Sequence, residues 1–400
     1  MSERNFAGRG ALALLALAAG ALPASAQDQL LFSLTSAGTA PFGALADGEI
    51  ARFDPVSGRC LPWLSMASGA FFAGDLDGDG ATDEWKDVDA LHVTPSGGRV
   101  SEVYLSFNAT TGPWLDGDIV RVGADGLLVL AWSEAQLIAA LGFSDGQVDV
   151  DGFALAPDGR LLLSFAEDEA SSLLSTDAIG VVTDGSIVSW DPVLALPGVE
   201  TTEGAIDALI SNALGRSLKS GDTLGVALDQ SGLLCFTVQS PSSDDATVFR
   251  AANGGEVVVA EASLGVTGAP EIDALGLVDA GAEFLAARVT PRLVPANVSA
   301  TVTLDGAANH AFVMTLALAR GDAASFAGDG FIGLFLDPTD LLFAASLADF
   351  TFTWGVTDGA GQATLQFDPA PPGITVTLFA QAYDFDGNTF GAPLALELEG

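Results

Sequence analysis

The sequence predicts an all-β fold, and its strand patterns and glycine content support that prediction. Short runs that alternate apolar and polar residues recur along the chain between clusters of Gly, Asp, Pro and Ser, which is typical of antiparallel strands joined by turns. The chain has 47 glycines, a residue type that favours turns and disfavours helix interiors. Hydrophobic residues make up 49% of the 400 positions, so the chain can bury a sizeable core.

Three short phrases recur in the same order between residues 27 and 291. The first is a strand opened by an acidic turn (116–120, 184–188), the second begins with Asp before apolar residues (89–93, 151–155), and the third is a turn with an outgoing strand (157–165). Copies of the third start near 30, 103, 161, 233 and 283, a spacing of about 50 to 73 residues. This spacing leaves room for about four units of four strands.

Such units suggest a propeller-like repeat domain over residues 27–291. The strand near residue 30 is out of phase with the other units, as expected if it completes the last sheet and closes a ring without exposed sheet edges. A stack of β-sandwich-like units is the alternative. Two helices are expected as insertions between the strands of a unit. They are Ser133–Leu141, with Ser133 as N-cap and Gly142 as stop, and Thr202–Leu214, with Gly215 as stop.

The repeated phrases end near Pro291. From residue 292 to 400 the chain again alternates apolar and polar residues between Asp, Gly and Pro turns, as in 298–304 and 311–318. We expect this segment to form a small antiparallel β-sandwich of about seven strands. A spacer or interaction domain is its simplest role, because we find no pattern of catalytic residues in it.

The first 26 residues have the pattern of a signal peptide. Arg4 and Arg9 precede an apolar run from Gly10 to Leu22, and Ala24-Ser25-Ala26 has the small residues of a cleavage site. The run is shorter than the roughly 20 residues that cross a bilayer. We therefore expect cleavage near Ala26 and a secreted protein, extracellular or periplasmic, without a membrane span.

The charge excludes several classes of partner. The chain carries 52 acidic and 14 basic residues, a net charge of -38, which repels phosphate backbones and anionic lipid headgroups. Nucleic acid is therefore not an expected partner, whereas an extracellular protein or glycan remains open. Cys60 and Cys235 are the only cysteines, so at most one disulfide can form, and two buried thiols are the simpler interpretation.

One acidic loop has the pattern of a calcium site. Residues 75–84 read DLDGDGATDE, so that carboxylates stand at loop positions 1, 3, 5 and 9 and Gly80 stands at the sharp turn. Hard oxygen ligands favour a hard cation, and crowded carboxylates repel one another without it. The predicted side-chain ligands are Asp75, Asp77, Asp79 and Asp83.

This loop resembles the calcium loop of integrin-type FG-GAP propeller repeats and, more distantly, dockerin and EF-hand loops. The resemblance covers about ten residues. It implies that the same four aspartates bind the ion, that Ala81 donates its carbonyl, and that the ion stiffens a hairpin within a blade. Lys86 stands where an EF-hand has its bidentate Glu. The repeated region also resembles uncharacterised secreted bacterial β-propeller-like proteins, which implies no activity.

Two other acidic patterns have a structural and a functional interpretation. Asp384, Asp386 and Asn388 could bind a second cation, but a turn closed by these side chains explains them equally well. Repeated aspartates before strands could form a ring of catalytic carboxylates, although Asp at such positions more often caps turns. These aspartates are Asp89, Asp151, Asp207 and Asp273.

No enzyme motif has a suitable context. Residues 142–146 read GFSDG, but a helix is expected before Ser144 and a strand after it, the reverse of a hydrolase nucleophile elbow. The leading interpretation is therefore a secreted, non-catalytic binding or surface-interaction protein with a calcium-stabilised loop. The alternatives are a secreted glycosidase-like propeller hydrolase with paired carboxylates and a structural extracellular component.

Overall fold

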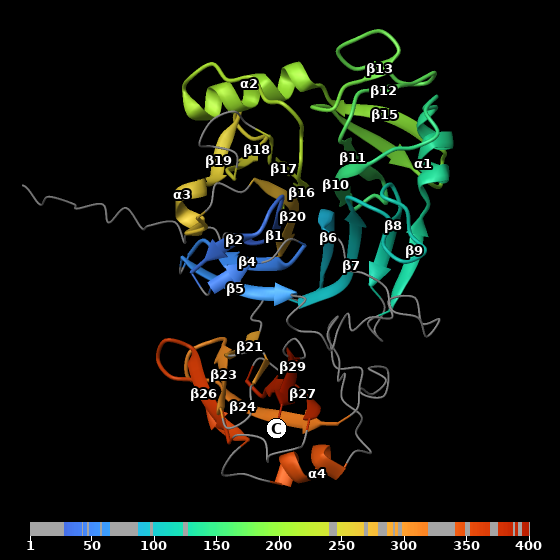
Figure 1. Cartoon of the computed structure of the whole chain (residues 1–400). Coiled ribbons are helices and arrows are strands. Elements are labelled where there is room, and N and C mark those ends of the chain that lie inside the picture. Colours follow the sequence, from blue (N-terminus) through green and yellow to red (C-terminus); the bar gives the residue numbers. More distant parts are fainter. Residues whose placement is uncertain are drawn as a thin grey trace, which may run out of the picture.

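The computed structural model describes most of the chain between residues 28 and 399 (Figure 1). The described ranges are 28–41, 43–45, 48–56, 58–64, 87–96, 99–122, 127–239, 246–267, 271–278, 286–290, 293–294, 298–318, 341–348, 353–368, 375–386, 389–390 and 394–399. The expected signal peptide and calcium loop lie outside these ranges. Within them, no helix has the length and apolar character needed to cross a membrane.

The first two thirds of the chain form four antiparallel sheets of four strands, each named here by its first strand. The β6 sheet has the strand order β6 (Val88–Ser96), β7 (Arg99–Phe107), β8 (Ile119–Val122) and β9 (Leu128–Trp132). The β10 sheet follows, with β10 (Val150–Leu155), β11 (Leu161–Phe165), β14 (Ile187–Asp191) and β15 (Leu196–Thr201), and then the β16 sheet, with β16 (Val226–Leu228), β17 (Leu234–Phe236), β18 (Val248–Arg250) and β19 (Glu256–Val259). The β20 sheet has the order β20 (Ile272–Val278), β1 (Gln29–Leu34), β4 (Ile50–Asp54) and β5 (Arg59–Leu64). The predicted strand-rich fold with units of four strands is confirmed.

The repeated phrases occupy matching positions in these sheets, apart from the copy of the third phrase expected near residue 283. The described residues of that copy, 286–290, pair with 301–305 in another sheet. The phrase that begins with Asp forms the first strand, the outgoing strand of the third phrase forms the second, and the strand after the acidic turn forms the third. Short hairpins add β2 (Gly38–Ala40) with β3 (Gly43–Leu45), and β12 (Glu169–Ala170) with β13 (Val181–Val182).

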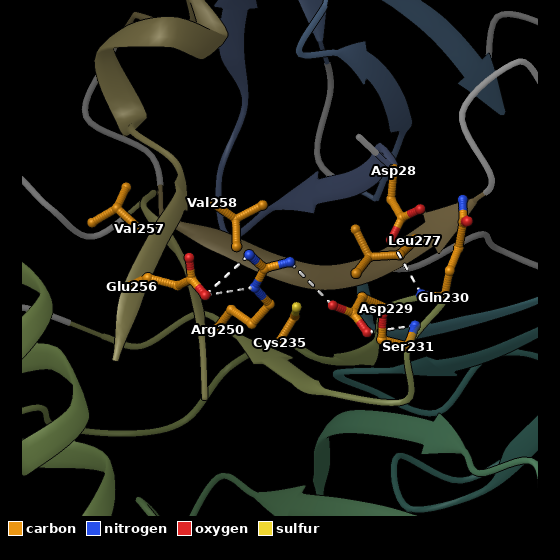
Figure 2. Close-up of a pocket in the computed structure, with 10 residues that line it drawn as sticks. All are labelled: Asp28, Asp229, Gln230, Ser231, Cys235, Arg250, Glu256, Val257, Val258 and Leu277. Carbon is orange, nitrogen blue, oxygen red and sulfur yellow. Dashed lines mark hydrogen bonds and ion pairs between the residues drawn. The ribbon is translucent and has the colours of Figure 1, made fainter. Parts of the chain in front are cut away.

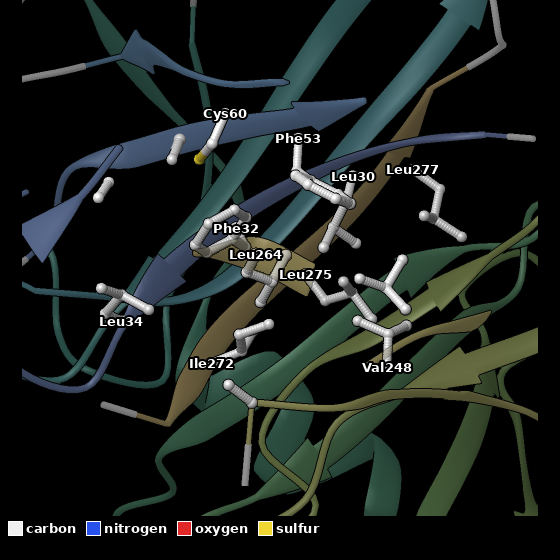
Figure 3. Packing of buried hydrophobic residues seen from close by; sticks show 14 of the residues in the cluster. Leu30, Phe32, Leu34, Phe53, Cys60, Val248, Leu264, Ile272, Leu275 and Leu277 are labelled. Carbon is white, nitrogen blue, oxygen red and sulfur yellow. The ribbon is translucent and has the colours of Figure 1, made fainter. Parts of the chain in front are cut away.

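The amino-terminal strand completes the β20 sheet, as the sequence predicts. β1 pairs with β20 on one side and with β4 on the other, so one sheet joins the two ends of the repeated region. Phe32 lies opposite Leu275 and is fully buried. Figure 3 shows Phe32 packed with Leu275 and Leu264, in a core that also includes Val248 of the β16 sheet.

The four first strands lie together in the middle of the four sheets (Figure 1). β20 contacts β6, β6 contacts β10, β10 contacts β16, and β16 contacts β20. Hydroxyl groups on or directly after second strands link successive sheets. Ser33 Oγ of β1 donates to the carbonyl of Val88 at 2.6 Å, and Thr237 Oγ1, directly after β17, donates to that of Ile272 at 3.2 Å. The arrangement brings the first strands' residues close to one another.

Small residues are needed where first strands approach a neighbouring sheet. A Cβ added at Gly152 of β10 would lie 2.6 Å from Val226 Cγ2 and 2.9 Å from the Leu224 carbonyl, and closer still to Ser164 Oγ. We therefore expect Gly152→Ala to lower the free energy of unfolding by about 1–3 kcal/mol through overpacking. Gly146→Ala is the control, since a Cβ there meets no atom within 4 Å. Equal denaturation midpoints for the two variants would contradict this close approach.

Helices connect one sheet to the next. α1 (Glu134–Leu141) has Ser133 as N-cap in a capping box and ends at Gly142, and α2 (Glu203–Leu214) has Thr202 as N-cap and ends at Gly215. Both predictions are confirmed, because the capping residues act locally. The expected place inside a unit is wrong: each helix follows the last strand of a sheet, as does the short α3 (Glu261–Leu264).

The carboxyl-terminal strands form two sheets that share a core. One has the order β21 (Ala286–Thr290), β23 (Ala300–Asp305) and β26 (Gln362–Phe367). The other has the order β22 (Leu293–Val294), β29 (Leu394–Glu399), β27 (Thr375–Asp384), β24 (Ala311–Ala317) and β25 (Trp354–Val356), with β28 (Thr389–Phe390) beside β27. α4 (Leu341–Ala348) contacts β24. Strand pairing crosses the expected boundary, because β21 lies before residue 291 and pairs with β23.

Cys60 and Cys235 are both buried as free thiols, as the simpler interpretation of the sequence predicted. Burial raises the pKa of the Cys60 thiol to about 12, and burial also raises the pKa of Cys235. A thiol that stays protonated is a poor nucleophile.

Candidate metal centre

The predicted calcium ligands lie outside the described residues. Their arrangement therefore stays a prediction for Asp75, Asp77, Asp79, Ala81 and Asp83. Other acidic residues form the strongest candidate site in the described part of the chain, and they belong to the first strands.

Three first strands present an aspartate at a β-bulge. In β6 the register moves from Val88 opposite Phe107 to Ala90 opposite Ser106, so that Asp89 is the extra residue. Asp151 of β10 lies in the same kind of irregularity, between Val150 and Gly152. A bulge redirects the side chain of the extra residue, and bulges are frequent beside functional sites.

The β20 strand repeats this feature at Asp273. Its pairing with β1 shifts between Leu275 opposite Phe32 and Ile272 opposite Leu34, which leaves one extra residue on β20. The amide of Ala274 donates to Ser33 Oγ at 3.2 Å, so the bulge is held by the second strand. All three bulge aspartates are buried, and Asp89 is only 4% exposed.

A second set of acidic residues surrounds the bulge aspartates. Asp87 precedes β6 and Asp149 precedes β10, each two residues before a bulge aspartate. Asp222 precedes β16, where the residue two positions further on is Leu224. The cluster, called the axial acidic cluster below, consists of Asp87, Asp89, Asp149, Asp151, Asp222 and Asp273.

Asp89 belongs to two groups of carboxylates in this cluster. Oxygens of Asp87, Asp89 and Asp273 all lie within 4.8 Å of one another, and so do oxygens of Asp89, Asp149 and Asp151. Two ligands on opposite sides of a Ca²⁺ ion are about 4.6–5.2 Å apart, because each Ca–O distance is about 2.3–2.6 Å. The spacing within each group therefore fits one cation.

Burial makes ionised carboxylates unfavourable here. Burial, followed by the negative charges of the neighbouring carboxylates, raises the pKa of Asp89 to about 12. In order of effect these neighbours are Asp273, Asp149, Asp151 and Asp87. Burial is also the main cause that raises the pKa of Asp149 and that of Asp222 to about 7. The cluster thus needs either protons or a cation to reduce its charge.

Hydrogen bonds satisfy only part of this cluster. Burial and the neighbouring charge of Asp222 raise the pKa of Asp151 well above its usual value, and the hydrogen bond that protonated Asp151 shares with Asp222 adds to this. Within the described residues, Asp89 Oδ2, Asp149 Oδ1 and Asp222 Oδ1 are buried and have no hydrogen-bond partner. A buried polar atom without a partner costs about 1–3 kcal/mol, and more when it is charged, which indicates that another group belongs there.

The structure corrects the prediction for the repeated aspartates. Asp89, Asp151 and Asp273 do not cap turns; they lie within strands and meet at one site. Asp207 is separate from them, because it lies on α2 and its Oδ1 accepts from the amide and the hydroxyl of Ser220 at 2.7 and 2.8 Å. The sequence interpretation missed Asp87, Asp149 and Asp222. The signal that could have identified them is the acidic residue that precedes each first strand.

The carboxyl-terminal turn combines three potential ligands that already bond to one another or to the backbone. His310 Nδ1 lies 2.8 Å from Asp384 Oδ2, Asp384 Oδ1 accepts from the amide of Asp386, and Asp386 Oδ2 accepts from that of Ala311. Their ligand atoms lie within 4.8 Å of one another. Asn388 lies outside the described residues. These bonds account for Asp384 and Asp386 as a closed turn.

Comparisons with known proteins do not identify a family. No family model matches the chain, and no curated protein matches it. Among solved structures, it is similar to a fungal alcohol oxidase of the AA5 family in complex with copper, with 8% identity over 93% of this chain and 95% of that chain. The TM-score is 0.21, so this likeness supports no statement about fold, copper or activity here.

Proposed function

We propose that this chain is an exported, non-catalytic calcium-binding protein built on a four-bladed β-propeller, which is followed along the chain by a β-sandwich. The cyclic contacts of the four first strands and the pairing of β1 with β20 support the propeller. The observation that carries the calcium proposal is the buried, unpartnered Asp89 Oδ2 between two groups of carboxylates.

Calcium fits the axial acidic cluster better than magnesium. Ca²⁺ accepts six to eight oxygen ligands in irregular geometry, whereas Mg²⁺ requires a near-ideal octahedron at about 2.0–2.1 Å and usually keeps several waters. Carboxylates from β6, β10 and β20 could surround an ion with few waters, since Asp89, Asp151 and Asp273 are all buried. An ion there would offset the carboxylate repulsion and link three blades.

A structural role for the ion is favoured over hydrolysis. The two carboxylates of a glycosidase stand about 5–10 Å apart, because substrate and water must fit between them. Within each group around Asp89 the oxygens lie within 4.8 Å, which suits a shared cation. Under this proposal the surface carries the binding role, toward an extracellular protein or glycan, and the predicted loop at Asp75–Asp83 holds a separate calcium ion.

Calcium-dependent unfolding tests the axial site. The experiment uses the chain with Asp77→Ala, which disables the predicted loop. At pH 7, a millimolar excess of calcium over chelator should raise Tm by several degrees, because an ion that binds only the folded state stabilises it by mass action. Magnesium at the same concentration should raise Tm less. An unchanged Tm in calcium would contradict a cation site at the cluster.

A further inference from the structure

Two cavities open near the ends of the first strands that are opposite to the axial acidic cluster. Asp89 and Asp151 are the second residues of β6 and β10, whereas the first cavity reaches Val93 of β6 and Leu155, the last residue of β10. The second cavity reaches Leu277, near the end of β20. The first cavity has a volume of about 380 Å³ and receives residues from all four first strands. A ligand there would contact every sheet of the repeated region.

The first cavity is mainly apolar. Its walls include Val93, Leu155, Leu228 and Leu277. His92 contributes a polar group without a charge: burial lowers its pKa to about 4, and its Nδ1 accepts from the Leu155 amide at 3.3 Å, which leaves the ring hydrogen on Nε2. This cavity therefore suits an aliphatic group. Asp229 also lines it, and the carboxylate of Asp229 pairs with Arg250 at 3.2 Å.

The second cavity, of about 310 Å³, carries a net negative charge. Figure 2 shows Arg250 held between Glu256, at 3.0 Å, and Asp229, at 3.2 Å. Because the guanidinium of Arg250 already forms these two ion pairs, we do not expect it to bind an anionic ligand. Asp28 adds a third carboxylate to the lining, so the formal charge has an excess of two negative groups over Arg250.

One oxygen of Glu256 is directed away from the ion pair. Both guanidinium contacts use Oε1, and in Figure 2 the other carboxylate oxygen points away from Arg250. Asp229 is fixed differently, because its Oδ1 accepts from the amides of Ser231 and Leu233 at 2.8 and 2.9 Å. Glu256 is therefore the carboxylate best placed to receive a further cationic group.

The two cavities are adjacent, so that an apolar space lies beside an acidic one. Asp229, Gln230 and Leu277 line both of them. We infer that the two adjacent cavities together form a binding site for an alkylammonium group, with the aliphatic part near His92 and Leu155 and the ammonium near Glu256. Lysine side chains and free alkylamines both carry this group. The site is independent of the proposed calcium ion.

A series of small probes tests this inference by calorimetry on the wild-type chain. Hexylammonium should bind at least tenfold more tightly than hexanol, because charge complementarity adds to the burial of the same alkyl chain. Hexanoate should also bind more weakly than hexylammonium. Affinity should rise about threefold per methylene from butylammonium to hexylammonium. Equal binding of hexanol or hexanoate would overturn the inference.

Variants locate the site and a peptide probe identifies the source of the group. Glu256→Gln should weaken hexylammonium binding by about fivefold or more. Glu200→Gln is the matched control, since Glu200 lies on β15, outside both cavities, and pairs with Arg160 at 3.2 Å. This variant should change the affinity by less than about twofold. Equal effects would refute the assignment. A blocked Leu-Lys peptide that binds more tightly than hexylammonium assigns the site to a polypeptide partner, and weaker binding assigns it to a free amine.

Discussion

In a chain whose predicted loop is disabled by Asp77→Ala, replacing Asp89 with asparagine is expected to stabilise the calcium-free protein at pH 7 and to remove most of the response to calcium. A carboxyl group must be protonated to remain buried in the cluster, since burial and its neighbours raise its pKa to about 12. In the unfolded chain the same group is ionised at pH 7. Asparagine keeps the shape without this proton uptake, so we expect a gain on the order of 2 kcal/mol.

The pH dependence follows from the raised pKa values of the cluster. Between about pH 4 and pH 7 the folded protein holds protons on Asp89, Asp149 and Asp222 that the unfolded chain has released. The stability of the calcium-free protein should therefore be greatest near pH 4 and should fall as the pH rises toward 7. If calcium binds the cluster as we propose, it replaces these protons, and its stabilising effect should grow over the same pH range.

Chemical denaturation at pH 4 and pH 7, with chelator and with calcium, measures both effects of Asp89→Asn. The benefit of asparagine should be largest at pH 7 and small at pH 4. Asp207→Asn is the control, because Asp207 recurs in the sequence pattern but lies on α2, where its carboxylate accepts a hydrogen bond from the amide of Ser220. If Asp89→Asn destabilises the calcium-free protein at pH 7, or leaves the calcium response intact, our account of the cluster is wrong.

Truncating Phe32 is expected to cost about 3–5 kcal/mol of unfolding free energy. Phe32 lies on β1, is fully buried, and shares its core with residues of the β16 sheet. The variant Phe32→Ala leaves a cavity where the amino-terminal strand joins β20. Weakening this strand would also expose the unpaired edge of β20, which favours aggregation.

Urea denaturation of Phe32→Ala measures this effect. Val56→Ala, at a site that is 73% exposed near the end of β4, is the control and should change stability by less than about 0.5 kcal/mol. A loss below about 1 kcal/mol for Phe32→Ala would show that β1 is not part of the cooperative fold.

Features that depend on nearby residues could be predicted from the sequence. Ser133 and Gly142 specify the ends of α1 because a capping side chain and a glycine with positive φ act within one helical turn. The recurrence of strand phrases predicted the four-stranded units, and the out-of-phase strand near Leu30 predicted its pairing with β20.

The axial acidic cluster could not be predicted in the same way, because its residues come together only when four sheets meet. Asp149 and Asp222 are more than 70 residues apart, and neither belongs to a compact ligand motif. Asp207 repeats the sequence context yet lies on a helix. In the sequence the bulges at Asp89 and Asp151 look like ordinary strand residues, since register shifts depend on the partner strand.

Calcium titration calorimetry on the Asp77→Ala chain at pH 7, with and without Asp89→Asn, tests the central claim most directly. We predict saturable binding to the Asp77→Ala chain with proton release that depends on the buffer, because calcium displaces protons from the cluster. Adding Asp89→Asn should abolish this heat. The same calcium isotherm in both proteins, or no binding in either, would contradict a cation site at the axial acidic cluster.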